Sequence, residues 1–323
     1  MRRRFRKFAA ALPAALSALL VCAVAATAPA QKRGEGAGRN ELRRDVRAVT
    51  IPVTLRLPER AQQTELSYLE DLQVFEDGER QEILAMRGAG RSPLTLVVLI
   101  QDDLVSSLSN EIRGIAGFVR KLPPGSRVMV GYLSAGSLRV RQKFTGDLER
   151  AAKSLRIPLS STAGSPYNPF ALTRDAVKRF ESQPVGRRAV LLLSDGIDIS
   201  RGVTQASPAN SVDLQRTINE AQRLGVAVHA IYAPSVGGGD PTLLTNGQGA
   251  LSRLSEETGG RAFYHGTAAP VSIDNFLREV DALLSRQFAL TYLSTHPDKG
   301  FHKVRVVAGM AEGEIIHPKG YTR

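Results

Sequence analysis

The sequence of 323 residues contains no tryptophan and only one cysteine, Cys22. Cys22 lies within residues 1–30, which we expect to be removed, so the remaining chain holds no cysteine. This excludes disulfides, thiolate nucleophiles and cysteine metal sites from the folded protein. Stability must then come from the core alone, and about 290 residues are enough for one large domain and one small one.

Several motifs of common enzyme families are also missing. No two of the five histidines have the i, i+4 spacing of helical metal ligands, and no Gly-x-Ser-x-Gly nucleophile elbow occurs. The glycine-rich segment 237–240 lacks the lysine of a phosphate-binding loop. We therefore predict that the protein is not an enzyme. A hydrolase whose triad assembles from distant residues stays open as an alternative.

Residues 1–30 have the layout of a secretory signal peptide. A basic head is followed by an uncharged apolar stretch, and Ala28-Pro29-Ala30 fits a small-residue cleavage site. Pro13 interrupts the apolar stretch, which is short for a membrane span. We expect an exported protein, periplasmic or extracellular, with no stable membrane span after cleavage. An uncleaved anchor, a lipid anchor on Cys22 and a twin-arginine export route remain alternatives.

Positive charge exceeds negative charge, but the two signs are mixed along the chain. Residues 1–30 carry five Lys and Arg and no Asp or Glu, so their removal lowers the formal net charge from +12 to +7. No run of Lys and Arg is interleaved with aromatic residues. We therefore expect no nucleic-acid binding.

The beginning of the mature chain predicts a small β unit. Residues 31–47 are polar and charged, which is typical of a disordered tether. Residues 48–90 then contain a segment that alternates like a strand and two β-prone runs on either side of Asp77-Gly78. Because glycine accepts a positive φ, this pair predicts a hairpin turn.

The pattern changes over residues 91–285. Largely apolar runs at 94–100, 188–193 and 226–233 predict strands that are buried on both faces, and segments with helical spacing lie between them. This alternation predicts an α/β domain: a mostly parallel sheet with helices on both faces. Residues 286–323 return to strand patterns, and we expect these strands to join the N-terminal β unit.

Three loops of the predicted sheet carry oxygen-bearing side chains. In open α/β sheets, ligands bind where the strands end at their carboxyl edge. One loop follows the first buried strand, another surrounds Ser165, and a third follows the strand that ends before Asp195. Hard cations such as Mg²⁺ and Ca²⁺ prefer oxygen ligands, so this edge is the candidate site. Asp198, in the third loop, is expected to be solvated.

These loops together resemble a von Willebrand factor A (vWA) domain with its metal-ion-dependent adhesion site. The flanking segments resemble the VWFA-related family described from acidobacteria, over about Val49 to Tyr321. The resemblance is carried by the segments LQVFEDGERQEI, SPLTLVVLIQDD, LLLSDGID, SRQFALTYLS and KGY. It implies an exported protein with a vWA-like, Rossmann-type domain joined to a small β accessory unit, and a divalent cation at the carboxyl edge.

The first loop departs from the family's Asp-x-Ser-x-Ser pattern in every frame. A start at Asp102 places Leu104 at the first serine position. A start at Asp103 places Val105 there, and a start at Gln101 loses the carboxylate. The implied site is therefore a degenerate one.

The resemblance nevertheless implies a set of metal ligands. Asp195 matches the expected aspartate and Ser165 would stand for the usual threonine. The predicted ligands of Mg²⁺ or Ca²⁺ are Asp195, Asp102 and Ser106, with Ser165 and Asp103 as further candidates. Structural alternatives remain: the Asp-Gly pair at 195–196 as an ordinary turn, and Asp102 or Ser106 as a helix cap.

Two functional hypotheses follow from these residues. In the first, the protein is a binding or adhesion module that engages a protein or surface polymer through the degenerate cation site. In the second, it is a metal-independent structural or assembly component of the bacterial envelope, and the cation site has lost its function.

Overall fold

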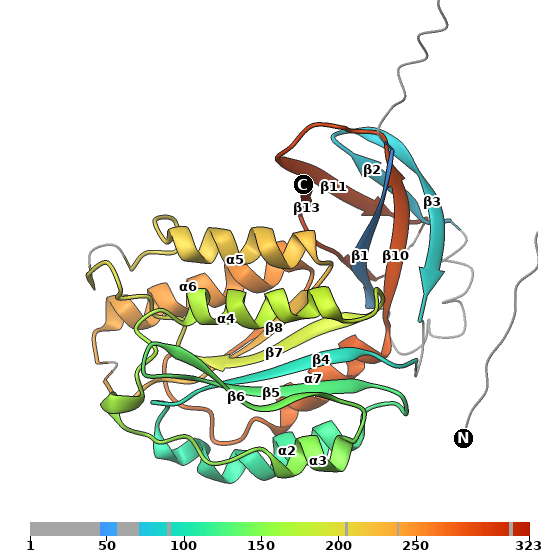
Figure 1. Cartoon of the computed structure of the whole chain (residues 1–323). Coiled ribbons are helices and arrows are strands. Elements are labelled where there is room, and N and C mark those ends of the chain that lie inside the picture. The colour runs from blue at the N-terminus through green and yellow to red at the C-terminus, as the bar shows by residue number, and fades with distance from the viewer. Residues whose placement is uncertain (1–45, 57–70, 89–91, 204–205, 238, 310–312) are drawn as a thin grey trace, which may run out of the picture. The chain divides into compact units, whose positions relative to one another are not determined.

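The computed structural model (Figure 1) describes residues 46–56, 71–88, 92–203, 206–237, 239–309 and 313–323. The predicted signal peptide and almost all of the predicted tether lie outside the described residues. Arg43–Arg323 form one compact unit, which contains a six-stranded and a seven-stranded sheet. No helix of the described residues is long and apolar enough to cross a membrane.

The six-stranded sheet has the order β6-β5-β4-β7-β8-β9, which is the Rossmann-type order when the strands are counted along the chain. The neighbours are parallel except for β6, which runs antiparallel to β5. All residues of the neighbouring strands β4 and β7 are buried, as their apolar runs predict. The strands are β4 Thr95–Gln101, β5 Arg127–Ser134, β6 Ser137–Thr145, β7 Arg188–Ser194, β8 Ala227–Tyr232 and β9 Ala262–Phe263.

Helices cover both faces of this sheet (Figure 1). Alternate residues of β4 serve two separate cores: Leu96 and Val98 face α2, α3 and α7, whereas Val97 faces α4, α5 and α6. The α-helices are α2 Ile112–Arg120, α3 Leu148–Lys153, α4 Pro169–Val177, α5 Val212–Arg223, α6 Pro241–Thr258 and α7 Asp274–Ser285. Short 3-10 helices are η2 Ser106–Glu111, η3 Thr162–Gly164 and η4 Lys178–Ser182.

The seven-stranded sheet is antiparallel and has the order β12-β1-β10-β3-β2-β11-β13. Strands from both ends of the chain share it, so the predicted fold class, an α/β domain with a β unit from N- and C-terminal strands, is confirmed. The strands are β1 Arg47–Arg56, β2 Gln73–Glu76, β3 Glu79–Arg87, β10 Gln287–Ser294, β11 Phe301–Val307, β12 Glu314–Ile316 and β13 Gly320–Thr322. β1 begins at Arg47, the last residue of the predicted tether.

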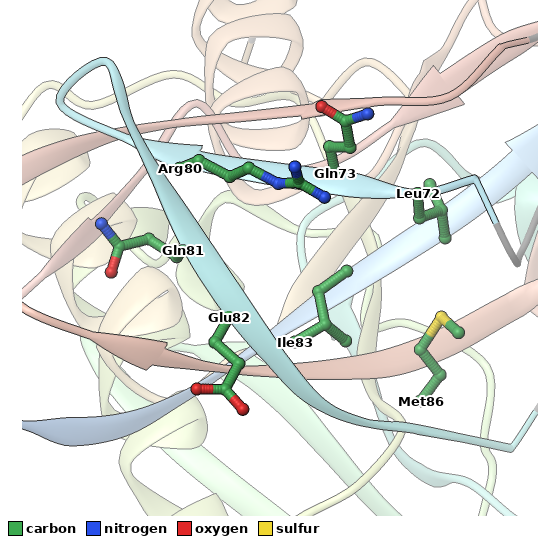
Figure 2. A pocket seen from close by; sticks show the side chains of 7 residues that line it. All are labelled: Leu72, Gln73, Arg80, Gln81, Glu82, Ile83 and Met86. Atoms are coloured by element: carbon green, nitrogen blue, oxygen red, sulfur yellow. The ribbon is translucent and has the colours of Figure 1, made fainter.

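The predicted hairpin joins β2 and β3. Asp77 and Gly78 both have positive φ, 50° and 91°, which is the backbone that an Asp-Gly hairpin turn requires. A pocket of about 530 Å³ lies over this hairpin. Figure 2 shows the side chains that line it: Leu72, Gln73, Arg80, Gln81, Glu82, Ile83 and Met86. None of these residues belongs to the loops that carry the predicted metal ligands.

The two sheets touch through α5 and its following turn. Gly225 has φ +61°, and a Cβ on it would lie 2.5 Å from the carbonyl oxygen of Thr50 in β1. The Thr322 hydroxyl donates a hydrogen bond to Gln222 Oε1 at 3.1 Å. The seven-stranded sheet, called the accessory sheet below, therefore packs directly against the C-terminal end of α5. The loops described next lie at the other end of this helix.

Candidate functional site

The loop after β4 is held in place by backbone hydrogen bonds to two other segments. Val236 N donates to Asp103 O at 2.9 Å, and Val105 N donates to Pro234 O at 3.1 Å, which ties the loop to the segment after β8. Ser160 N donates to Asp102 O at 2.9 Å, which ties it to the segment after α3. Loops that are far apart in sequence are thereby joined at the carboxyl edge of the sheet.

Two carboxylates converge at this edge, on Asp103 and Asp195. Both are buried, with exposed fractions of 5% and 3%. The side chain of Gln101, the last residue of β4, lies between them. Its Nε2 donates to Asp103 Oδ1 at 2.8 Å, and its Oε1 accepts a hydrogen bond from Asp195 N at 3.2 Å.

Two serine side chains lie beside these carboxylates. Ser165 lowers the pKa of the neighbouring Asp103, and Ser235 lowers the pKa of the neighbouring Asp195, each against the larger effect of burial. Ser235 is buried and Ser165 is half-buried. The arrangement therefore brings together residues from all three predicted loops and from the loop after β8.

The carboxylates of Asp103 and Asp195 are poorly compensated. Burial raises the pKa of Asp195 to about 6, and the like charge of Asp103 adds to this effect, against hydrogen bonds from Ile197 N, Ser235 and Gln101. Burial also raises the pKa of Asp103, and the charge of Asp102 acts in the same direction. Among the described residues, neither carboxylate forms an ion pair. A buried carboxylate without a counter-charge either holds a proton or binds a cation.

Asp102, by contrast, is fully paired. Its Oδ1 and Oδ2 each accept a hydrogen bond from the Arg156 guanidinium, at 2.7 Å from Nη1 and 2.7 Å from Nη2. Leu159 N also donates to Oδ1 at 3.0 Å. Burial alone would raise the pKa of Asp102, but the hydrogen bonds from Arg156, Ser134 and Leu159 lower it below its usual value.

The structure divides the five predicted ligands into two groups. Asp102 and Ser106 were expected beside Asp195, but both oxygens of Asp102 are bonded to Arg156, and Ser106 is exposed at the start of η2. Asp103 and Ser165, the further candidates of the predicted set, lie on the side of Asp195. The helix-cap alternative also differs from the structure, because no side chain caps η2 or α2 with a hydrogen bond.

Asp198 differs from its expected solvated position as well. Its exposed fraction is 8%, and its carboxylate accepts hydrogen bonds from the hydroxyls of Ser200 at 2.7 Å and Ser211 at 3.0 Å. It organises the loop after β7 and the start of α5. It does not belong to the group around Asp103 and Asp195.

Sequence reasoning missed Gln101, Arg156 and Ser235. A start of the family pattern at Gln101 was set aside because it loses the carboxylate, yet Gln101 is the residue that lies at the centre of the site. Arg156 follows a short helix without any motif, 54 residues from its partner Asp102. Ser235 had no signal beyond its place after an apolar strand.

A glycine pair packs α6 against the strand end that carries Asp195. A Cβ on Gly247 would lie 2.1 Å from the carbonyl oxygen of Asp195, and a Cβ on Gly196 would lie 2.4 Å from the carbonyl oxygen of Gly247. Gly196 also has φ +68°. The backbone beneath Asp195 is therefore fixed by close contact with a long helix.

The donor set fits a hard cation in part. Carboxylate and hydroxyl oxygens from Asp103, Asp195, Ser165 and Ser235 are ligands that Mg²⁺ and Ca²⁺ accept. Within the described parts of the chain, however, no group of three or more His, Cys, Asp or Glu side chains is placed to hold a metal. The Gln101 N–H group aimed at Asp103 also takes one carboxylate oxygen. Water would have to supply several of the ligands.

Apolar side chains are exposed on the segments around this site. Tyr167 is 55% exposed and sits at φ 57°, a backbone conformation that is rare for a residue other than glycine. Its carbonyl accepts a hydrogen bond from Ile199 N at 3.0 Å. We call this set the apolar rim: Ile157, Leu159, Tyr167, Ile199 and Val236, each more than a third exposed.

No protein-family model matches the sequence, and no curated protein matches it. Solved structures with a similar fold include an aerotolerance-related membrane protein from Bacteroides fragilis, at 14% identity and TM-score 0.41, with 59% of this chain and 98% of that chain covered. BatB from Bacteroides thetaiotaomicron is 15% identical at TM-score 0.38, with 59% and 98% covered. Manganese-loaded TRAP from Plasmodium vivax is 11% identical at TM-score 0.39, with 75% and 100% covered. Likenesses at this level carry no conclusion about function.

Proposed function

We propose that this chain is an exported vWA-like binding module that engages a protein or surface polymer with the loops at the carboxyl edge of its parallel sheet. Asp103 and Asp195 would hold a divalent cation there, together with the hydroxyls of Ser165 and Ser235. The observation that supports this proposal is the convergence of two buried carboxylates without an ion pair among the described residues. A cation bound there would supply a positive charge to which an acidic group of a partner could attach.

The energetics of burial favour a cation. An ionised carboxylate taken out of water loses solvation that only a counter-charge or a proton restores. Asp102 has such a counter-charge in Arg156, whereas Asp103 and Asp195 have hydrogen bonds from neutral groups only. With a pKa of about 6, Asp195 is mostly ionised at neutral pH and is therefore available as a ligand.

The apolar rim supports a macromolecular partner. Clustered apolar side chains that remain exposed beside a polar site are typical of protein interaction surfaces. The rim lies on the same segments as the oxygen donors, since Val236 N is bonded to Asp103 O and Leu159 N to the Asp102 carboxylate. A partner that reached the cation would also cover the rim.

Thermal unfolding of the purified protein tests the proposal. A ligand that binds only the folded state raises the midpoint by mass action, which at a hundredfold excess over Kd amounts to about 2.7 kcal/mol. We expect Mn²⁺, Mg²⁺ or Ca²⁺ to raise the midpoint relative to EDTA, and Asp195→Asn to abolish the shift. Asp198→Asn is the matched control. Asp198 is a buried aspartate of the same loop, and its carboxylate accepts hydrogen bonds from the hydroxyls of Ser200 and Ser211.

A metal-independent structural or assembly role is the second candidate function, and Gln101 favours it. An amide N–H donor between two carboxylates takes a position where a cation site usually has oxygen. In this role one of the two carboxyl groups keeps its proton, and partner contacts are insensitive to EDTA. The absence of any ion-dependent shift in the wild-type protein would favour this candidate.

A further inference from the structure

We infer that Arg156 is a positioning residue for the cation site, which it organises without touching the site's ligands. This inference rests on the proposed function, because it concerns the geometry of the same site. The arginine joins two of the loops that supply ligands: the loop after β4, with Asp102 and Asp103, and the segment that leads to Ser165.

The Arg156 guanidinium and the Asp102 carboxylate form a two-bond fork. Two parallel hydrogen bonds of 2.7 Å fix both the distance and the plane of the two groups. The Asp102 side chain is completely buried, while Arg156 retains 30% exposure. The carboxylate also accepts from Leu159 N, so Asp102 holds the backbone of the second segment as well as its arginine.

Arg156 is itself supported by Tyr132, a buried residue of β5. Arg156 N donates to the Tyr132 hydroxyl at 2.7 Å, and this hydroxyl donates to Arg156 O at 2.6 Å. The guanidinium carbon lies 4.1 Å from the centre of the Tyr132 ring. Side chain and backbone of Arg156 are therefore both attached to the rigid sheet.

The contacts of Arg156 with Asp102 and Tyr132, which we call the Arg156 lock, are connected to the site through the backbone. Asp102 and Asp103 are neighbours in the chain, and their side chains have different partners: Asp102 meets Arg156 and Asp103 meets Gln101. A rotation of the backbone at Asp102 would move Asp103 as well. A Cβ on Gly164 would lie 3.2 Å from the Asp102 carbonyl, so the residue before Ser165 packs on the same peptide. The Arg156 lock thus sets the positions of both Asp103 and Ser165.

Positioning and simple electrostatics predict opposite effects of removing Arg156. Without its partner, the Asp102 carboxylate would add negative charge beside Asp103, and this alone would strengthen cation binding. Loss of the lock would instead let Asp103 and Ser165 adopt many positions, and the cation would bind more weakly because its ligands are no longer held in place. Arg156→Ala therefore separates the two effects by the sign of the change in Kd.

The experiment measures Mn²⁺ binding to the full protein at pH 7.5 by the electron paramagnetic resonance signal of free Mn²⁺. We expect Arg156→Ala to raise Kd at least tenfold, and Arg156→Lys, which keeps the charge but not the fork, to raise it by a smaller factor. Arg223→Ala is the matched control: Arg223 is also paired with a carboxylate, at the far end of α5, and its loss should leave Kd unchanged. Unfolding midpoints in EDTA identify any variant that fails to fold.

Three outcomes are decisive. An equal or lower Kd in Arg156→Ala would overturn the positioning role while the proposed function stands. If the alanine variant does not fold, an unchanged Kd in Arg156→Lys would overturn the role in the same way. If the wild-type protein itself binds no Mn²⁺, the proposed function fails, and this inference fails with it.

Discussion

Gln101 and Asp103 are joined by a hydrogen bond of 2.8 Å between the glutamine Nε2 and the aspartate Oδ1, at a position where only 1% of Gln101 is exposed. Of the three frames in which the family's acidic pattern could begin, the one that starts at Gln101 places a neutral amide at the carboxylate position. The amide donates one hydrogen bond to a carboxylate and offers no charge. The presence of an amide in place of a carboxylate at residue 101 therefore sets the net charge of the site.

Gln101→Asp should convert the site into one with three carboxylates. Because a third buried negative charge is added without a counter-charge, we expect the free energy of unfolding in EDTA to fall by about 2 kcal/mol. Saturating Mn²⁺ should restore it, with a larger ion-dependent shift than in the wild-type protein. Urea unfolding in EDTA and in Mn²⁺ measures both values. Destabilisation that Mn²⁺ does not relieve would argue against a cation at this place.

Asp195 should make stability depend on pH. Its pKa is raised from 3.8 to about 6, so the folded state binds a proton more tightly than the unfolded state. The contribution of Asp195 to the free energy of unfolding is then largest below pH 4 and is lost as the pH rises through 6, by about 3 kcal/mol in total.

The difference between the wild-type protein and Asp195→Asn reports this effect together with its coupling to Asp103, since the titrating groups that do not interact with Asp195 cancel. The free energy of unfolding of each protein is measured with urea in EDTA from pH 4 to pH 8. We expect the wild-type value minus the Asp195→Asn value to fall as the pH rises. A difference that is constant over this range would show that Asp195 does not titrate as its burial requires.

His302 should make stability depend on pH in the same direction as Asp195. Its Nδ1 lies 2.7 Å from Asp77 Oδ2 and its Nε2 lies 3.0 Å from Asp298 O. Both partners are acceptors when Asp77 is ionised, so both ring nitrogens donate and the ring is the charged imidazolium. Burial lowers the pKa of His302, but the hydrogen bonds to Asp298 and Asp77 and the nearby charges of Asp77 and Glu76 outweigh it and raise the pKa.

A raised histidine pKa stabilises the folded state below the unfolded value of 6.5, and this stabilisation is lost as the pH rises through the higher folded value. We expect His302→Asn to lower the free energy of unfolding by about 1–2 kcal/mol at pH 6 and by less at pH 9. The pH titration of the His302 ring by nuclear magnetic resonance gives the pKa directly. A value below 6.5 would contradict the assignment.

Gly247→Ala should disturb the strand end that carries Asp195. The added Cβ would lie 2.1 Å from the Asp195 carbonyl oxygen, so α6 must move away from the sheet. We expect a loss of about 2–4 kcal/mol in urea unfolding. Gly117→Ala is the matched control in a helix: nothing lies within 4 Å of its Cβ, and alanine there should stabilise by up to about 1 kcal/mol.

The fold could be predicted because its signals are local and strong. The buried strands β4, β7 and β8 are largely apolar runs, and the Asp77-Gly78 pair predicts a hairpin turn with positive φ. Even the return of the C-terminal strands to the accessory sheet follows from a change of pattern near Arg286. Periodicity and turn residues carry this information without any knowledge of distant contacts.

The candidate site could be predicted only down to its loops. Asp102 and Asp103 are adjacent, and which of them faces Asp195 depends on the residue at which β4 ends and on an arginine 54 positions away. No periodicity encodes that pairing, because it is a contact between two loops. Alignment with the family's Asp-x-Ser-x-Ser pattern favoured Asp102 as a ligand. In the structure, the Asp102 carboxylate is hydrogen-bonded to Arg156.

The central claim is that Asp103 and Asp195 together hold a divalent cation. Isothermal titration calorimetry of the wild-type protein with Mn²⁺ at pH 7.5, beside Asp103→Asn, Asp195→Asn and Asp198→Asn, tests it most directly. We predict one binding site in the wild-type protein and in Asp198→Asn, and a loss of binding in each of the other two variants. A wild-type protein that binds no Mn²⁺, or binding that survives in Asp103→Asn and Asp195→Asn, would contradict the claim.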